Sequence, residues 1–481
     1  KSFALIIMCA PLFGAMIAGF LGKKIGKGLT SFVTIFFVSI SFIFSVYLFI
    51  LISFISPDIK SQQIHLYDWA DILNIKFQIG LLIDRLSCFM AVIVTFVSLC
   101  VHVYSVGYMK GDSGYQRFFS YISAFTFAML ALVLADDFLL LFFGWEGVGL
   151  VSYLLIGFWF EKDAATTAGM KAFIVNRIGD LGFLLGIALI LMYTSSLNFQ
   201  EIFVNIPALA SAKVVVPIYP GGPEVSVITL MGVLLFIGAM GKSAQIPLHV
   251  WLEGSMEGPT PISALIHAAT MVTAGVYMIA RMSPIIEYSV PAMSLILIIG
   301  SATCFFMGLI AIVQFDIKKV IAYSTLSQLG YMVAAEGASA FSLGLFHLMT
   351  HAAFKALLFL AAGSVIVGMH HEQDMRKMGG LRRYMPVTYV TFLIGALALV
   401  AIPPFAGFYS KDLIIDAVIN SKIPGAYIAK IFVILGAFVT SIYTFRMFFM
   451  VFHGKERMSS DVKSHLKESP KSILIPLIIL A

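Results

Sequence analysis

Four charged residues lie inside apolar stretches that are long enough to cross a lipid bilayer. They are Glu146, Lys242, Lys355 and Lys411. A charge at membrane depth costs at least about 2.5–3.5 kcal/mol on insertion scales, so such a residue normally faces a bundle interior or a hydrated path. Several charges of this kind in one chain therefore predict a pathway for protons or ions, and with it a transport protein.

Two histidines share a helical stripe with one of these lysines. His347, His351 and Lys355 are spaced at i, i+4 and i+8, which puts them on one face over about 12 Å of helix rise. Histidine exchanges a proton near neutral pH, and a desolvated lysine can do the same. We expect this stripe to relay protons. The alternatives are a metal site on the two histidines, which the aligned lysine would disfavour, and simple pairing of polar groups across helices.

Glu146 is the acidic residue among the four buried charges, and it lies in an aromatic and glycine-rich helix over 142–150. A buried carboxylate stays ionised beside a lysine, so we expect a Glu146–Lys242 pair whose charge state alters proton affinity elsewhere; a purely structural ion pair is the alternative. Asp180 can either pair with Arg177 one turn earlier or tune Glu146 and Lys242.

Two further residues complete the predicted path. His267 is surrounded by small residues over 264–270, which leave room for water beside the imidazole. We group it with Lys242 in the first half of the chain, and we place Lys411 in the second half.

The composition identifies the elements that must position these residues. The chain has 481 residues, of which 60% are hydrophobic and only 12% charged, whereas soluble domains carry about 25% charged residues. We therefore predict an all-α integral membrane protein with about fourteen transmembrane helices. The predicted spans are 3–21, 30–55, 82–108, 118–135, 137–159, 166–194, 226–252, 260–281, 291–313, 319–336, 340–369, 387–419 and 424–452, with a truncated helix beginning near 472.

The distribution of positive charge predicts the orientation of these spans. The net charge is +6, but most basic residues outside the helices fall in alternate loops, including Lys318 and Lys319, which argues against nucleic acid as a partner. Positively charged loops mark the cytoplasmic side, so we expect the N-terminus outside. Of the two long outer loops, 56–81 alternates apolar and polar residues and predicts a β-hairpin. Asp136 and Asp137, in a short outer loop, are expected as surface charges.

Prolines interrupt two of the predicted spans in corresponding places. Pro247 lies five residues after Lys242, and Pro403 lies eight before Lys411; proline inside a helix removes a backbone hydrogen bond. Interrupted helices in two halves point to a transporter's central site. Since five helices separate the breaks, we predict two inverted five-helix repeats at 118–281 and 291–452, preceded by three helices in 1–117 and followed by a loop and helix start in 453–481.

Several classes of chemistry have no support in the sequence. The four cysteines are scattered within predicted helices, and no pair has the spacing of an iron–sulfur or structural zinc site. No phosphate-binding loop is present. We therefore expect neither a redox centre nor ATP-driven transport in this chain.

Four segments together resemble one known family, the antiporter-like membrane subunits of respiratory complex I, or NADH:quinone oxidoreductase, and specifically its subunit L (chain 5 in mitochondria). The resemblance runs from about residue 82 to 452. It rests on Phe-Phe-Gly-Trp-Glu-Gly-Val-Gly-Leu (142–150), Met-Glu-Gly-Pro-Thr-Pro (256–261), Ala-Leu-Ile-His-Ala-Ala-Thr-Met-Val (264–272) and Gly-Phe-Tyr-Ser-Lys-Asp (407–412).

The resemblance implies roles for the same residues. Glu146 and Lys242 match the family's first-channel pair, His267 its linking histidine, Lys355 its central lysine and Lys411 its outlet lysine. It further implies proton translocation coupled to electron transfer from NADH to quinone in other subunits, which would hold FMN and iron–sulfur clusters, with no cofactor in this chain. The implied partners are complex I membrane-arm subunits, especially a second antiporter-like subunit, and the implied location is a bacterial or mitochondrial inner membrane.

One departure and one rival qualify the match. Where the family has Pro-Asp-Ala, this chain has Glu253, Gly254 and Ser255, which affects the geometry of that turn and not the channel residues. The rival is the large subunit of a multisubunit sodium/proton antiporter, which shares most channel motifs. The Gly-Phe-Tyr-Ser-Lys-Asp segment favours complex I.

Overall fold

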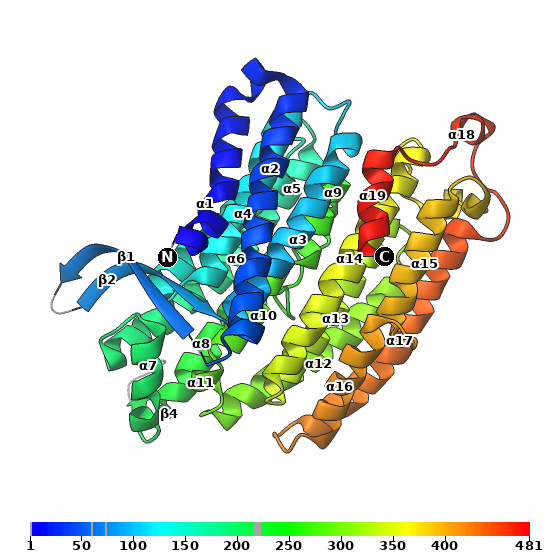
Figure 1. Cartoon of the computed structure of the whole chain (residues 1–481). Coiled ribbons are helices and arrows are strands. Elements are labelled where there is room, and N and C mark those ends of the chain that lie inside the picture. The colour runs from blue at the N-terminus through cyan, green and yellow to red at the C-terminus, as the bar shows by residue number, and fades with distance from the viewer. Residues whose placement is uncertain (1, 59–60, 73–74, 216–222) are drawn as a thin grey trace.

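A computed structural model describes residues 2–58, 61–72, 75–215 and 223–481 of the chain. These residues form a bundle of helices packed side by side, with a two-stranded hairpin at one end (Figure 1). We call this end the hairpin end. The opposite end carries α18 (Figure 1).

The helices are α1 (Ser2–Met16), α2 (Gly22–Ile50), α3 (Arg85–Tyr108), α4 (Tyr115–Leu134), α5 (Phe138–Ile156), α6 (Asp163–Thr194), α7 (Phe199–Asn205), α8 (Val227–Lys242), α9 (Thr260–Ala268), α10 (Met271–Arg281), α11 (Ser283–Ile286), α12 (Val290–Val313), α13 (Ile317–Gly337), α14 (Phe341–Gly368), α15 (Pro386–Val400), α16 (Ala406–Asn420), α17 (Ala426–Phe452), α18 (Ser460–His465) and α19 (Lys471–Leu480). The strands are β1 (Ser61–Ile72), β2 (Ile75–Asp84), β3 (Lys213–Val215) and β4 (Glu224–Ser226).

The prediction of an all-α membrane protein is confirmed by the length and hydropathy of the helices. Within the described ranges, nine helical segments are long and apolar enough to cross a bilayer. The count of fourteen spans is not confirmed. A complete crossing needs about 20 residues, and the apolar helices α8, α15 and α19 have 16, 15 and 10.

The predicted hairpin is present and is fixed to the bundle at its base. β1 and β2 pair antiparallel from Ser61↔Asp84 to Ile72↔Ile75. Asp84 then caps α3 by accepting a hydrogen bond from the Ser87 amide at 2.7 Å, which satisfies a donor that the first helical turn leaves free. Its carboxylate also pairs with the buried Arg281 at the end of α10. The second long loop holds α7 and the β3–β4 pair, which the sequence did not predict.

Three interruptions divide helices inside the bundle. α8 ends at Lys242, the next helical turn is η4 (Gly254–Glu257), and Pro247 lies between them. α15 ends at Val400 and α16 begins at Ala406, with Pro403 between them. The third interruption was not predicted. It separates α9 from α10, where Thr270 has φ −125° and ψ −100°, and no proline or glycine marks it in the sequence.

Asp136 and Asp137 differ from the prediction of surface charges. Both are buried, with 4% and 1% of their surface exposed. Asp137 caps α5 by accepting a hydrogen bond from the Leu140 amide at 2.8 Å. Asp136 lies against the backbone of Gly80 in β2, where a side chain would not fit. The hairpin therefore covers the α4–α5 turn, and this tertiary contact could not be read from the sequence of the loop.

Burial gives these two carboxyl groups a measurable pH signature. It raises the pKa of Asp136 to about 6 and the pKa of Asp137 to about 7, with the Asp136 charge adding to the effect on Asp137. Since the unfolded chain releases these protons at lower pH than the folded chain, the two groups reduce stability as pH rises from about 4 to 7.

Asp136→Asn should therefore raise the thermal unfolding midpoint of the purified protein at pH 8, by about 2 °C or more, and by less at pH 5. At pH 5 the wild-type carboxyl is still largely protonated, so little destabilisation is left to remove. Tryptophan fluorescence during heating would measure both values. Asp58→Asn, at an exposed position near the same end, serves as the control. An equal shift of the unfolding midpoint at both pH values would contradict the raised pKa of Asp136.

Candidate proton-transfer site

Lys242 lies at the junction of three helices, where it forms a buried ion pair. It is the last residue of α8, and its ammonium lies 3.6 Å from Oδ1 of Asp180 in α6. Trp145 of α5 donates a hydrogen bond from Nε1 to the same oxygen at 2.6 Å. The two ion-pair side chains are 1% and 4% exposed. The structure therefore assigns Asp180 as the direct partner of Lys242.

Glu146 forms its ion pair with Arg177 of α6, not with Lys242 as the sequence predicted. Neighbouring positions on a helix point about 100° apart. On α5 it is Trp145 that faces Lys242, with the ammonium 5.6 Å from the ring centroid. Arg177 also approaches Asp180 at 3.9 Å. The cluster is thus an alternating row of four charges, and Glu146 and Lys242 are at its two ends.

Glycines make the space for this cluster. A Cβ at Gly149 would lie 2.8 Å from the Lys242 ammonium, so α5 can approach only because it has no side chain there. A Cβ at Gly179 would lie 3.0 Å from the Gly241 Cα, and the backbones of α6 and α8 meet at this point. Close helix contact through small residues is the usual way to pack helices in a membrane.

His267 lies between η4 and α14. It is the next-to-last residue of α9 and lies beside the interruption before α10. Its Nε2 is 3.0 Å from the Ser255 hydroxyl, and its ring packs on Phe359 of α14 with centroids 4.9 Å apart. His351 of α14 faces the backbone of Ala268 in the same interruption. The break thus brings His267 next to the predicted stripe.

The stripe of α14 faces polar groups of α13. Lys355 donates to the Ser324 hydroxyl, and His347 Nε2 lies 3.1 Å from Oε1 of Gln328. The rings of His347 and His351 are 6.3 Å apart. All three stripe residues are almost completely buried. Periodicity placed them on one face of the helix, and the structure adds the hydroxyl and amide partners that periodicity could not identify.

Lys411 lies at the helix interruption of the second half. Its ammonium donates to the Leu399 carbonyl at 3.1 Å, one of the carbonyls that the end of α15 leaves without an intrahelical partner. The ammonium also lies 5.1 Å from the ring centroid of Tyr331. The preceding residue, Ser410, contacts His347 Nδ1 at 2.8 Å. Lys411 is therefore adjacent to the end of the α14 stripe.

Sequence reasoning missed one buried lysine. Lys318, predicted in a cytoplasmic loop, is 2% exposed and donates to the carbonyls of Met256 and Gly258 at 2.5 and 2.8 Å. The next residue, Lys319, pairs at 2.8 Å with Glu253, the carboxylate that departs from the family pattern. Lys318 differs from a solvated lysine only through the tertiary contact between α13 and the turn that contains Met256 and Gly258.

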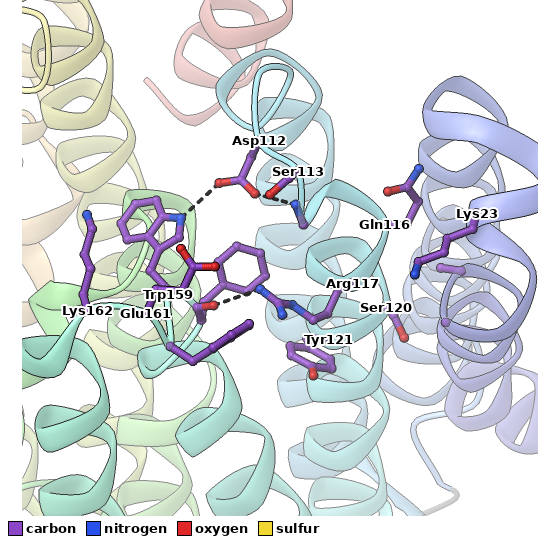
Figure 2. Close-up of a pocket in the computed structure, with 15 residues that line it drawn as sticks. Lys23, Asp112, Ser113, Gln116, Arg117, Ser120, Tyr121, Trp159, Glu161 and Lys162 are labelled. Atoms are coloured by element: carbon purple, nitrogen blue, oxygen red, sulfur yellow. Dashed lines mark hydrogen bonds between the residues drawn. The ribbon is translucent and has the colours of Figure 1, made fainter.

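The surface hollow in Figure 2 is separate from these residues. Lys23, Asp112, Arg117 and Lys162 are among the residues that line it, and none of the predicted site residues does. Arg117 there is held by the Phe158 carbonyl at 2.9 Å. No group of three or more histidine, cysteine or acidic side chains in the described part of the chain is placed to hold a metal ion.

The sequence matches two family models. The model described as NADH:quinone oxidoreductase/Mrp antiporter, TM, matches residues 135–453, and the model for the N-terminus of chain 5 of complex I matches residues 69–119. NADH-quinone oxidoreductase subunit L of Neisseria meningitidis serogroup B is 53% identical, over 99% of this chain and 73% of the relative. The protein of the same name in Rickettsia bellii is 52% identical, over 100% of this chain and 73% of the relative.

A solved structure has the same arrangement of helices. A chain of the Mrp complex from Dietzia sp. DQ12-45-1b superposes with a TM-score of 0.83 at 26% identity, and the match covers 100% of this chain and 49% of that chain. Family models and relatives thus agree over nearly the whole sequence. The chain belongs to the NADH:quinone oxidoreductase/Mrp antiporter transmembrane family and, within it, to the family of NADH-quinone oxidoreductase subunit L.

Proposed function

We propose that this chain is the proton-translocating, antiporter-like subunit of an NADH:quinone oxidoreductase. Electron transfer from NADH to quinone takes place in other subunits, which hold FMN and iron–sulfur clusters, and this chain moves protons across the membrane in response. The observation that carries the proposal is the line of buried titratable side chains from Lys242 through His267 and Lys355 to Lys411.

The proton path runs along this line. Asp180 supplies the counter-charge that the buried Lys242 ammonium needs, because burial disfavours a charge that lacks a partner. If Asp180 turns toward Arg177, which already lies 3.9 Å away, Lys242 loses its counter-charge and releases its proton toward His267. Loss of the charge on Glu146, the partner of Arg177, has the same effect from the far end of the row, because Arg177 is then free to bind Asp180 and Lys242 again loses its counter-charge.

The second half of the path uses α14 and α16. The proton passes from His267 to the stripe of His351, His347 and Lys355, and the hydroxyl of Ser410, the residue before Lys411 in α16, leads from His347 toward the outlet. Ser410 lies 2.8 Å from His347 Nδ1. A hydroxyl both donates and accepts a hydrogen bond, so it can pass a proton between two such groups.

We propose that the segments 118–281 and 291–452 are inverted five-helix repeats. Lys242 ends α8, and the Lys411 ammonium binds a carbonyl at the end of α15. In both segments a cation therefore lies at the carbonyl end of an interrupted helix, where the helix dipole favours positive charge. The broken helices carrying Pro247 and Pro403 are the corresponding elements. We also propose that the hairpin end is the outer face, with the N-terminus on that side, because positively charged loops mark the cytoplasmic side.

A second antiporter-like membrane subunit is the partner that we propose for the α5–α6 face. In the isolated chain the side chains of Glu146 and Arg177 are 21% and 42% exposed in the middle of apolar helices. An ion pair exposed to lipid is expensive. A neighbouring subunit with polar groups at this depth would cover it and would also sense its charge.

The alternative function is that of the large subunit of a multisubunit sodium/proton antiporter, a related family to which the superposed Mrp complex belongs. Tagging the chain in its native membrane and assaying the gently purified material for NADH-dependent quinone reduction tests the two. Co-purifying flavin and iron–sulfur subunits with activity support the proposal. Small membrane subunits with sodium/proton exchange and no quinone reduction would overturn it.

Lys411→Ala should leave the complex assembled but lower the number of protons pumped per quinone reduced, because the outlet loses its proton-binding group. Proton uptake by inverted membrane vesicles, divided by NADH oxidised, measures this ratio. Lys430→Ala, at an exposed position of α17, is the matched control. An unchanged ratio in Lys411→Ala would remove this lysine from the path.

Glu146→Gln should reduce pumping and coupled turnover more than Glu146→Asp, since aspartate keeps the charge that holds Arg177 away from Asp180. The same vesicle assay, with the NADH oxidation rate as a second readout, compares the two variants. Equal losses in both variants would instead point to a packing role for the Glu146 side chain.

A further inference from the structure

Glu336 is a buried carboxyl group that the path described above does not use. It lies in the last turn of α13, at the hairpin end, and has 0% of its surface exposed. Among the described residues, neither of its carboxyl oxygens has a hydrogen-bond partner. A carboxyl group without hydrogen bonds in such a position destabilises the fold. Packing alone does not account for it, because a methionine or leucine would fill the same space without this cost.

A glycine of α14 makes room for the Glu336 side chain. A Cβ at Gly344 would lie 3.2 Å from Cγ of Glu336 and 3.1 Å from the Met332 carbonyl. Any larger residue at 344 would press on this turn of α13. Gly344 is one turn before His347 on α14, a rise of about 4.5 Å, so Glu336 lies beside the next position of α14 beyond His347.

Glu336 lies on the same side of α13 as two polar contacts with α14, one position further along. These antiparallel helices meet at Ser324 and Lys355, then at Gln328 and His347, and then at Glu336 and Gly344. Each contact is closer to the hairpin end than the one before it. The Nε2 amide of Gln328, in the middle contact, has no partner among the described residues and can still bind a water or a neighbouring acid.

We propose that Glu336 is a proton-binding residue that extends the line of α14 beyond His347 toward the hairpin end. The inference rests on the proposed function, since it assumes that protons move along this line. In the step, the His347 imidazolium gives up its N–H proton and becomes neutral, and the Glu336 carboxylate becomes a carboxylic acid. Glu336 then releases the proton to water at the hairpin end and becomes a carboxylate again. One bridging water or a rotation of the glutamate side chain joins the two groups.

The test compares three variants in the assembled complex within inverted membrane vesicles. Glu336→Gln keeps the shape of the side chain but cannot accept the proton, so it should lower protons taken up per NADH oxidised. Glu336→Asp keeps the carboxyl group and should retain most of the pumping. Glu287→Gln removes an exposed carboxylate at the same end and should leave the ratio unchanged. If Glu336→Gln does not assemble, Glu336→Met replaces it, and the same loss is expected.

Lys411→Ala, measured in parallel, distinguishes a failure of the Glu336 inference from a failure of the proposed function. If Lys411→Ala lowers the ratio while Glu336→Gln pumps like wild type, Glu336 is a neutral packing group and the inference is overturned, although the proposed function stands. Equal losses in the glutamine and aspartate variants of Glu336 also overturn it. If neither Lys411→Ala nor Glu336→Gln alters the ratio, the proposed function fails together with the inference.

Discussion

The binding of lysine ammonium groups inside an apolar bundle is the constraint on which the rest of this structure depends. Lys242, Lys355 and Lys411 are each at most 2% exposed, so every one needs a polar partner within the protein. The partners are a carboxylate for Lys242, a serine hydroxyl for Lys355 and a backbone carbonyl for Lys411. A regular helix has few groups to offer, because its carbonyls are bonded internally. Each charge therefore needs either a side chain from a neighbouring helix, as Lys242 and Lys355 have, or irregular backbone, as Lys411 has.

The interrupted helices supply the irregular backbone. An interruption frees carbonyl and amide groups in the middle of the bundle, where lipid could not satisfy them. Lys411 uses one carbonyl at the end of α15, and the Trp251 indole donates to another, that of Gly241 in α8, at 3.0 Å. Glycines contribute in a different way, because they let helices approach until short polar groups can reach across. The same elements thus lower the cost of the charges and hold them close to their partners.

Much of this arrangement follows from sequence patterns, for identifiable physical reasons. Hydropathy predicts helices such as α14 because burial in lipid demands long apolar runs, and alternation predicts the β1–β2 hairpin. Spacing places His347, His351 and Lys355 on one face because an α-helix has a fixed period. The prolines at 247 and 403 fall where helices stop.

Pairings across helices are what the sequence cannot supply. Glu146 binds Arg177 rather than Lys242 because of the rotation of α5 about its axis, which no local pattern records. Lys318 and Asp136 look like loop residues until the turn and the hairpin that cover them are known. No proline or glycine marks the break after Ala268 in the sequence. Tertiary contacts with α14 hold this break in place. Residue type therefore predicts which groups are able to bind a proton, and packing decides which of them meet.

Lys318 has a mechanical consequence for the whole chain. Its side chain joins the first turn of α13 to the carbonyls just before α9, and the Lys319–Glu253 pair fastens the same place a second time. Residues 60 to 66 positions apart in the chain are thus tied together at the end opposite the hairpin. These bonds fix the first turn of α13 against the turn before α9, so a tilt of α13 relative to α9 would have to break them.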